Sequence, residues 1–301
     1  MKYKLFLWGS TILYRLLDKG ACTRLAHSKI GFFINGFVFG KKDKIILFET
    51  KEGIKVKLPL SDAFTLGLAH LGTIGEDETF LIKKILKKGD TVMDVGAYID
   101  GWYSLMASKL IGSKGKVYTF EPHPDHYNLL EDNVKLNNFT NIEVIKLGVS
   151  DKAGIFGFTS AGIGSSLVGK SLKKNLKKKI IKIKTTTIDK FIQEKKIKNI
   201  SLIKIDVEGA EMKVLKGAKQ LLQQKNSPDL ILEVVDGFLK NAGSSKSELL
   251  SYLNKIGYKQ YEFIHNGLKP YVYNPKPKKK EPITNIYFSK NDSRLSPFIR
   301  E

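Results

Sequence analysis

Three carboxylates and a lysine lie within eight residues, KIDVEGAE, directly after an apolar run that reads ISLI. A carboxylate in this position can take the proton of a hydroxyl, and a neighbouring ammonium can orient that carboxylate or stabilise a developing alkoxide. Lys204 and Asp206 are two residues apart, so both point to the same side of a strand. Because an unpaired buried charge is costly, the pair predicts mutual burial or a polar cleft at the strand end.

Further acids are expected near this pair. Glu208 should project just beyond the sheet, and Glu233 ends the next apolar run, LILEV. Glu211 falls in the first turn of the following helix, where the helix dipole explains an acid. The candidate catalytic residues are therefore Asp206, Glu208, Lys204 and Glu233, with a purely structural Lys204–Asp206 ion pair as the alternative.

Two other predicted strand ends suggest a nucleoside ligand. DVGAYIDG starts at Asp94, and its Gly96 permits a tight turn, while N–H groups at a helix start suit a carboxylate or phosphate. Glu121 ends the next strand, where an acid can accept the hydroxyl hydrogens of a ribose. Asp94 disfavours phosphate and suits the ammonium of an amino acid. Ribose plus amino acid indicates S-adenosylmethionine rather than NAD.

These strand ends require a sheet, and the pattern from Thr91 to about Lys290 predicts one. Continuous apolar runs alternate with amphipathic segments, which is typical of a doubly wound, mostly parallel α/β sheet covered on both faces. The predicted strands cover 91–96, 115–122, 141–149, 200–207 and 229–235, and the predicted helices cover 101–112, 125–138, 210–224 and 245–257. TNIYF, at 284–288, is expected to be a last, antiparallel edge strand.

Residues 1–75 are interpreted as an N-terminal extension with an amphipathic helix at 5–17, a β-hairpin turning at Glu52-Gly53, and a short helix. A helix is also predicted within 75–90, at the start of the main domain, 76–301. A lysine-rich insertion at about 153–187 fits two short strands joined by a basic loop. The N-terminal helix packs on its own domain or, alternatively, lies on a membrane surface.

The chain has 51 Lys+Arg against 30 Asp+Glu, a formal charge of +21. Such a field attracts nucleic acid, anionic lipid or an acidic substrate, although a lysine-rich surface also serves solubility. Cys22 is the single cysteine, which excludes an intramolecular disulfide and a multi-cysteine metal site and fits a reducing compartment. No run reaches the ~18 apolar residues of a transmembrane helix. The expected location is cytoplasmic, with peripheral membrane contact as an open alternative.

Six blocks of this sequence resemble FkbM-type S-adenosylmethionine-dependent methyltransferases. They read VMDVGAYIDGWYSLMASK, GKVYTFEPHPDHYNLLEDNVKLNN, LGVSDKAG, TTTIDKF, LIKIDVEGAEMKVLKGA and LILEV. The resemblance runs from about Thr91 to Val235 and thinly on to Phe288. It implies the class I methyltransferase fold, a Rossmann-like seven-stranded sheet with its last strand reversed.

Matching positions imply a cofactor site. Asp94 and Gly96 would line the methionine portion, Glu121 would hold the ribose, and Val149 with Ser150 would lie beside adenine. An acid at Asp206 would favour the sulfonium. The remaining expected contacts come from the neighbours of these residues, namely Ala97, Tyr98, Gly101 and Pro122.

The sequence departs from the family in the first loop, where the usual spacing is D-x-G-x-x-x-G. Asp100 occupies the last position and the glycine follows at 101, so the loop has an extra residue or a shifted helix start, and Asp100 could cap the helix. His123 and His126 could form a metal pair, but a solvated loop with Asp125 as helix cap is the favoured interpretation. No metal site is predicted.

The leading hypothesis is an O-methyltransferase acting on a hydroxyl of a sugar, glycolipid or related metabolite. DVEG lacks the Asn/Asp-Pro-Pro-aromatic block that base N-methyltransferases commonly carry at this strand end, which favours oxygen over nitrogen. An RNA ribose 2′-O-methyltransferase is the alternative, because lysines could follow phosphates, but the basic segments lack interleaved aromatics. A third alternative is a non-catalytic scaffold that keeps the cofactor fold.

Overall fold

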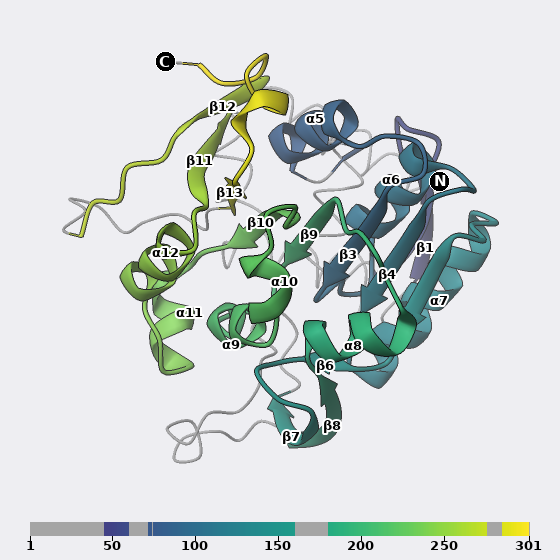
Figure 1. Ribbon diagram of the computed structural model, residues 1–301. Helices are drawn as coiled ribbons and strands as arrows, with labels where there is room; N and C mark the ends of the chain where they lie inside the picture. The colour runs from purple at the N-terminus through teal and green to yellow at the C-terminus, as the bar shows by residue number, and fades with distance from the viewer. Residues whose placement is uncertain (1–44, 60–71, 74, 160–179, 276–284, 301) are drawn as a thin grey trace, which may run out of the picture.

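The computed structural model describes residues 45–59, 72–73, 75–159, 180–275 and 285–300 (Figure 1). The predicted helix at 5–17, the short helix expected before residue 75 and the lysine-rich loop of the insertion lie outside these ranges. Within them, no helix has both the length and the apolar character needed to cross a membrane.

A large mixed sheet organises the described part of the chain. Its strands are β3 (Thr91–Val95), β4 (Lys116–Phe120), β5 (Ile142–Ile145), β9 (Leu202–Ile205), β10 (Asp229–Glu233), β11 (Lys259–Ile264), β12 (Gly267–Pro270) and β13 (Asn285–Ser289). Their order is β12-β11-β13-β10-β9-β3-β4-β5. The block from β10 to β5 is parallel, and β13 is antiparallel to both of its neighbours. The predicted mostly parallel sheet with a reversed last strand is confirmed, with eight strands instead of seven.

The position of the last strand differs from the prediction. β13 lies inside the sheet, between β10 and β11, and the edge is formed by β12. β11 and β12 are a hairpin that turns at Asn266, whose φ of 56° is left-handed. Ile264 pairs with Gly267, so the loop consists of His265 and Asn266, and asparagine is a residue that tolerates the left-handed conformation.

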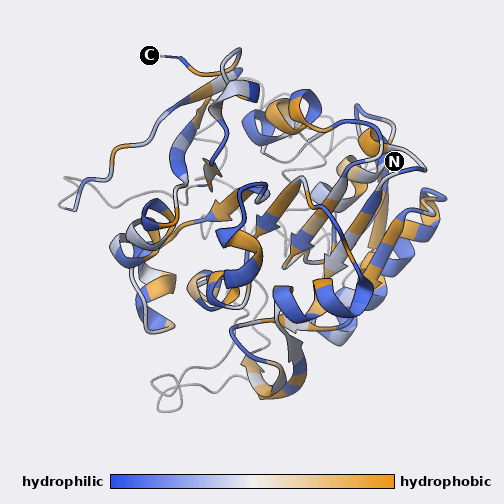
Figure 2. Ribbon diagram, viewed as in Figure 1, coloured by the Kyte–Doolittle hydropathy of each residue, from blue (hydrophilic) through white to orange (hydrophobic). Residues whose placement is uncertain are grey.

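Helices cover both faces of the sheet (Figure 1). They are α5 (Glu76–Ile85), α6 (Trp102–Ile111), α7 (Pro124–Leu136), α8 (Ile188–Lys195), α9 (Glu211–Lys216), α10 (Lys219–Gln223), α11 (Asp236–Asn241) and α12 (Lys246–Lys255). Apolar residues of α8 to α12 form one core with one face of the strands, and those of α5 and α6 form a second core with the other face. Figure 2 shows hydrophobic residues concentrated in the strands and on one side of the helices.

Two predicted elements are each broken by a tertiary contact. The segment expected to be one strand at 141–149 stops at Ile145, and Gly148–Val149 forms a separate strand, β6, in another sheet. The helix expected at 210–224 is divided into α9 and α10 next to Gly217. A Cβ there would lie 2.1 Å from the Ser150 carbonyl oxygen, so the close approach of two backbones requires glycine.

The two predicted hairpins are confirmed. β1 (Ile45–Glu49) pairs antiparallel with β2 (Lys55–Pro59), and Asn133 of α7 exchanges hydrogen bonds with the β2 backbone at Lys57. In the insertion, β7 (Gly154–Thr159) pairs antiparallel with β8 (Ile180–Thr186), and β6 completes this small sheet. The division of the chain at residue 75 stays a prediction.

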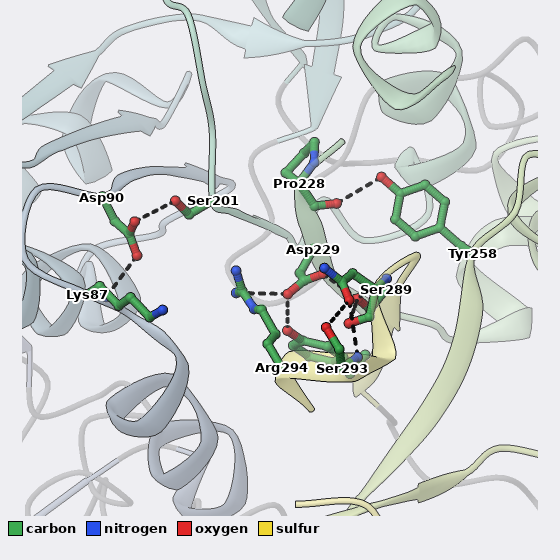
Figure 3. A network of polar contacts seen from close by, with 11 residues as sticks. Lys87, Asp90, Ser201, Pro228, Asp229, Tyr258, Ser289, Ser293 and Arg294 are labelled. Carbon is green, nitrogen blue, oxygen red and sulfur yellow. Dashed lines mark hydrogen bonds and ion pairs between the residues drawn. The ribbon is translucent and has the colours of Figure 1, made fainter. Parts of the chain in front are cut away.

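A buried polar network lies at the amino ends of the parallel strands of the large sheet (Figure 3). Asp229, at the start of β10, accepts hydrogen bonds from the hydroxyls of Tyr287 and Ser289 on β13. It also forms an ion pair with Arg294 at 2.9 Å. Burial raises the pKa of Asp229 in spite of the guanidinium. The network fastens the segment after β13 to the sheet on the side opposite the predicted site.

Candidate active site

The carboxyl ends of β3, β9 and β10 and the amino end of the antiparallel β13 present polar side chains on one face of the sheet. Asp94 of β3 is the register partner of Lys204 on β9, and Glu233 of β10 is the partner of Asn285 on β13. Asp206 follows Lys204 by two residues and therefore points to the same face. We call these five residues, Asp94, Lys204, Asp206, Glu233 and Asn285, the carboxylate row.

Lys204 is the buried cation of the row, with 2% of its surface exposed. Its Nζ donates to Asp206 Oδ2 and to Asn285 Oδ1, both at 3.0 Å, and lies 5.3 Å from the centre of the Tyr103 ring. Burial lowers the pKa of Lys204, but the carboxylates of Asp206 and Glu233 raise the pKa more, so it lies above its ordinary value. Of the two members of the predicted pair, Lys204 is buried at the strand end and Asp206 is partly exposed.

The acids of the row differ in ionisation. Burial raises the pKa of Asp94 to about 6, although the Ser104 hydroxyl donates to it at 2.6 Å and Lys204 is near. Burial, together with the charge of Asp206, raises the pKa of Glu233 to about 8. Asp206 has 34% of its side chain exposed and lies in direct contact with the Lys204 ammonium. At neutral pH Glu233 is mainly protonated, and Asp206 is the acid in direct contact with the ammonium.

The loop after β3 touches the tip of β9 at Asp206. Gly96 has a φ of 89°, and a Cβ at this position would lie 1.9 Å from the carbonyl oxygen of Asp206. The Asp206 N–H in turn donates to the Val95 carbonyl oxygen at 2.9 Å. Glycine is therefore required at 96 for a close backbone approach that brings Asp206 beside the loop.

The same loop contacts Glu121 on its other side. The buried Glu121 carboxylate accepts from the Tyr98 N–H at 3.1 Å and from the His123 N–H at 2.8 Å. Tyr98 has a left-handed φ of 57°, a conformation that costs a non-glycine residue about 1 kcal/mol and is typical of functional sites. Asp94–Tyr98 is thus one short segment with Glu121 on one side and Asp206 on the other.

The start of α6 explains the unusual glycine spacing. Gly101 is the N-cap of α6, and Asp100, one residue earlier, accepts from the Trp102 N–H at 2.8 Å, so Asp100 bonds the helix start without occupying the cap position. Gly101 has a φ of 56°, and a Cβ on it would lie 2.2 Å from Leu130. The N–H groups of Gly96 and Ala97 both donate to the Phe120 carbonyl oxygen. These two donors are therefore used within the protein, which differs from the expectation that they face a ligand.

The turn after β9 is also tightly held. Glu211, 1% exposed, accepts from the N–H groups of Val207 and Gly209 at 3.2 and 3.0 Å. Burial raises its pKa to about 7. Glu208 sits in this turn with a left-handed φ of 49°. The Glu211 carboxylate therefore holds the backbone of the turn in place. This role goes beyond the interaction with the helix dipole that the sequence position of Glu211 indicated.

The remaining predicted cofactor residues have the following places. Pro122 joins Glu121 to His123 and is partly buried. Val149 belongs to β6 and is buried in the core under α8, and the buried Ser150 donates its hydroxyl to Asp151 at 3.0 Å. Their contact with adenine stays a prediction.

The two histidines after Glu121 stack on one another. The ring centres of His123 and His126 are 4.2 Å apart, and His126 Nδ1 lies 3.6 Å from Glu121 Oε1. Burial and the neighbouring His126 lower the pKa of His123. His123, rather than the predicted Asp125, caps α7, because its Nδ1 accepts from the Asp125 N–H. In the described ranges no group of three or more His, Cys, Asp or Glu side chains is arranged to hold a metal ion.

The sequence analysis missed three side chains that contact Lys204 or its partner. Asn285 accepts from Lys204 and donates through Nδ2 to Glu78 Oε1 at 2.9 Å. The phenol of Tyr103 has its pKa raised well above the ordinary value by burial and by Glu78. The acidic first turn of α5, which contains Glu78, is in the sequence typical of any helix start. Nothing local in TNIYF marks Asn285 as a site residue.

The residue set fits S-adenosylmethionine. Two of the roughly four acceptor positions on the Glu121 carboxylate are used by backbone N–H groups, which leaves acceptors for the hydroxyls of a ribose. On the other side of the loop, Asp94 and Asp206 lie near one ammonium, that of Lys204, while Glu233 is mainly protonated, and two acids against one lysine suit a cationic group.

Comparisons with known proteins find similarity to methyltransferases. Residues 94–260 match the family model of the methyltransferase FkbM domain. The chain is similar to the hexuronic acid methyltransferase AglP of Haloferax volcanii, with 28% identity over 151 residues that cover 50% of this chain and 59% of that protein. It is also similar to the methyltransferase sdnD of Sordaria araneosa, with 27% identity over 158 residues, 43% of this chain and 60% of that protein.

Among solved structures, the methyltransferase FkbM from Methylobacillus flagellatus KT shares 17% identity with this chain. The TM-score is 0.44, and the match covers 75% of this chain and 53% of that one. The chain thus spans between half and two thirds of the length of each of these relatives. At such values the fold assignment depends on the strand order described above and on the matched family model.

Proposed function

The chain belongs to the FkbM family of methyltransferase domains, and from this premise we propose that it is an S-adenosylmethionine-dependent O-methyltransferase acting on a hydroxyl of a sugar, glycolipid or related metabolite. The observation that carries the proposal is the segment Asp94–Tyr98. It contacts Glu121 through the Tyr98 N–H and Asp206 through Gly96. A ribose-binding acid and a proton-accepting acid are thereby held on the two sides of one loop.

Bound S-adenosylmethionine supplies a methyl group on a positively charged sulfur, which a nucleophile can displace. The protein's part is to hold the cofactor and to prepare the nucleophile. Glu121 would hold the ribose hydroxyls, and Asp94 with Gly96 would lie along the methionine portion. Val149 and Ser150 would border the adenine.

Asp206 is the residue to which we assign the removal of the hydroxyl proton. It contacts the Lys204 ammonium at 3.0 Å and is partly exposed, so an acceptor hydroxyl can reach it. Lys204 would orient this carboxylate and stabilise the alkoxide. Glu233 is mainly protonated at neutral pH, with its pKa at about 8, so it would donate a hydrogen bond instead of taking the proton. Glu208, in the adjoining turn, would contact the acceptor.

A sugar acceptor is supported by one relative whose name gives hexuronic acid as its substrate. Near the turn after β9, Phe158 and Ile183 of the β7–β8 hairpin pack against Ala210. Lys182 and Lys184 lie on the opposite, exposed side of β8.

The decisive experiment compares cells with and without the gene by untargeted mass spectrometry of metabolites and glycans. The expected result is a hydroxyl-bearing compound that is lighter by one CH2 in the cells without the gene. Complementation with the wild type should restore the increment, and complementation with Asp206→Asn at equal protein level should not. A restored methyl group on a nitrogen would contradict O-methylation, and a methyl group on RNA ribose would replace the sugar acceptor by the nucleic-acid alternative.

A further inference from the structure

The contacts of Lys204 extend beyond the family-matched segment to two residues that the proposed mechanism does not use. Asn285, at the start of β13, accepts one N–H of the ammonium, and Glu78, in the first turn of α5, accepts the amide N–H of Asn285. Both residues lie outside 94–260, the segment that matches the family model. The result is a chain of contacts, Glu78–Asn285–Lys204–Asp206, that we call the lysine chain.

The chemistry of the lysine chain fixes its direction. A lysine ammonium can only donate hydrogen bonds and an ionised glutamate can only accept them, whereas an amide does both. Asn285 therefore turns its oxygen to Lys204 and its nitrogen to Glu78. An amide joins the ammonium and the carboxylate without adding a charge.

The arrangement selects among several acids near Lys204. The ammonium faces Asp94 on β3, Asp206 on β9 and Glu233 on β10, with Tyr103 of α6 against it. Without Asn285, a flexible lysine side chain could pair with any of these carboxylates. With Asn285 in place, one N–H is held at β13 and another points to Asp206 Oδ2.

The lysine chain ends at an accessible group. Lys204 has 2% of its side chain exposed and Asp206 has 34%. The lysine chain leads from Glu78, in the first turn of α5, through the buried ammonium to the carboxylate that adjoins the Gly96 loop. A buried positive charge is thereby held against a carboxylate that an acceptor hydroxyl can reach.

We propose that Asn285 and Glu78 are positioning residues that hold Lys204 against Asp206 and so determine which carboxylate of the row receives the acceptor's proton. The inference rests on the proposed function for its catalytic meaning. Its structural content, the fixation of one ammonium group by residues of α5 and β13, can be tested without any acceptor.

The first test observes the Lys204 ammonium directly by nitrogen-detected NMR of the ¹⁵N-labelled protein, with the signal assigned through Lys204→Arg. In the wild type the three hydrogens should exchange slowly with water because the group is buried and bonded. Asn285→Ala should speed the exchange roughly tenfold or more, the effect of losing one hydrogen bond to a charged group. Asn285→Asp keeps the shape of the asparagine side chain and serves as the test if the alanine variant is unstable. Its carboxylate repels Glu78, so the NMR signal of the Lys204 ammonium should also change.

Glu78 variants separate positioning from general effects of charge. Glu78→Gln keeps an oxygen that accepts from Asn285 and should leave the Lys204 signal close to that of the wild type, whereas Glu78→Leu should change it as Asn285→Ala does. Asp77→Asn is the matched control, since it removes an acid from the same turn of α5 without touching Asn285. An unchanged Lys204 signal in both Asn285→Ala and Glu78→Leu would overturn the proposal.

The second test uses the acceptor once mass spectrometry has identified it. Asn285→Ala and Glu78→Leu should lower kcat roughly tenfold with KM and the affinity for S-adenosylhomocysteine within about twofold, and Glu78→Gln should restore kcat. A rise in KM at unchanged kcat would contradict a positioning role. If no hydroxyl acceptor exists, the proposed function fails, but the NMR result still decides whether Asn285 and Glu78 fix Lys204.

Discussion

Gly96 and Asp206 lie in backbone contact, so close that a Cβ on Gly96 would be 1.9 Å from the Asp206 carbonyl oxygen. This contact joins the loop after β3 to the tip of β9. It makes the two halves of the candidate site, one around Glu121 and one around Lys204, parts of a single structure.

Gly96→Ala should therefore destabilise the protein by about 3 kcal/mol, because the clash with Asp206 adds to the strain of a positive φ. Gly89→Ala is a matched control. Gly89 has nearly the same φ, 88° against 89°, and nothing within 4 Å of an added Cβ. It should cost about 1 kcal/mol from backbone strain alone. Urea unfolding of both variants measures the difference, and equal losses would argue against the close contact.

Glu121→Ala should weaken the binding of S-adenosylhomocysteine by roughly ten- to a hundredfold, because hydrogen bonds to an ionised carboxylate are lost. Glu131→Gln, on the outside of α7, serves as the control and should bind as the wild type does. Isothermal titration calorimetry gives both constants. Unchanged affinity in Glu121→Ala would remove this carboxylate from the ribose site.

Asp206→Asn should lower kcat by roughly a hundredfold or more, the usual contribution of a general base, with little change in cofactor affinity. Glu208→Gln should lower kcat to a smaller degree. Single-turnover transfer from methyl-labelled S-adenosylmethionine measures the chemical step. If Glu233→Gln lowered the rate of this step more than Asp206→Asn, the proton would have to be assigned to Glu233.

The raised pKa of Glu233 predicts the pH dependence of stability. Its pKa rises from an ordinary value of 4.5 to about 8, first through burial and then through Asp206. Between these pH values the folded state binds more protons than the unfolded state, so this group lowers stability as pH increases, and its effect levels off above pH 8. Glu233→Gln should match the wild type near pH 4.5 and exceed it near pH 8.5 by several kcal/mol, because each unit of pKa shift corresponds to about 1.4 kcal/mol.

Thermal unfolding at a series of pH values measures this difference. Glu143→Gln is a suitable control, because Glu143 is a partly exposed acid at the other end of the sheet that pairs with Lys195. A constant difference between wild type and Glu233→Gln across this range would show that Glu233 is not held protonated.

Much of the fold could be predicted because local patterns and tertiary structure agree. Apolar runs such as those ending in Val95, Ile205 and Glu233 are buried strands, and the amphipathic segments between them are helices. The prediction failed where a distant contact overrides the local pattern. Gly217 breaks a helix because the Ser150 backbone passes against it, and residues 148–149 leave their sheet to pair with β8.

The same reasoning explains which site residues were found. Asp206, Glu208 and Lys204 are neighbours in the sequence, so their spacing already implies a common strand end. Glu78 and Asn285 are 207 residues apart, and no local signal relates them. The two residues meet only because β13 is inserted next to β10, whereas the sequence analysis placed this strand at the edge of the sheet.

The interior place of β13 has a consequence for how the chain assembles during its synthesis. β11 and β12 leave the ribosome before β13, yet they can join the sheet only through β13, because β11 has no direct pairing with β10. The hairpin must therefore wait, with its inner edge unpaired, until residues 285–289 have been made. Lys204 also lacks its hydrogen bond to Asn285 until then, because Asn285 belongs to that same strand.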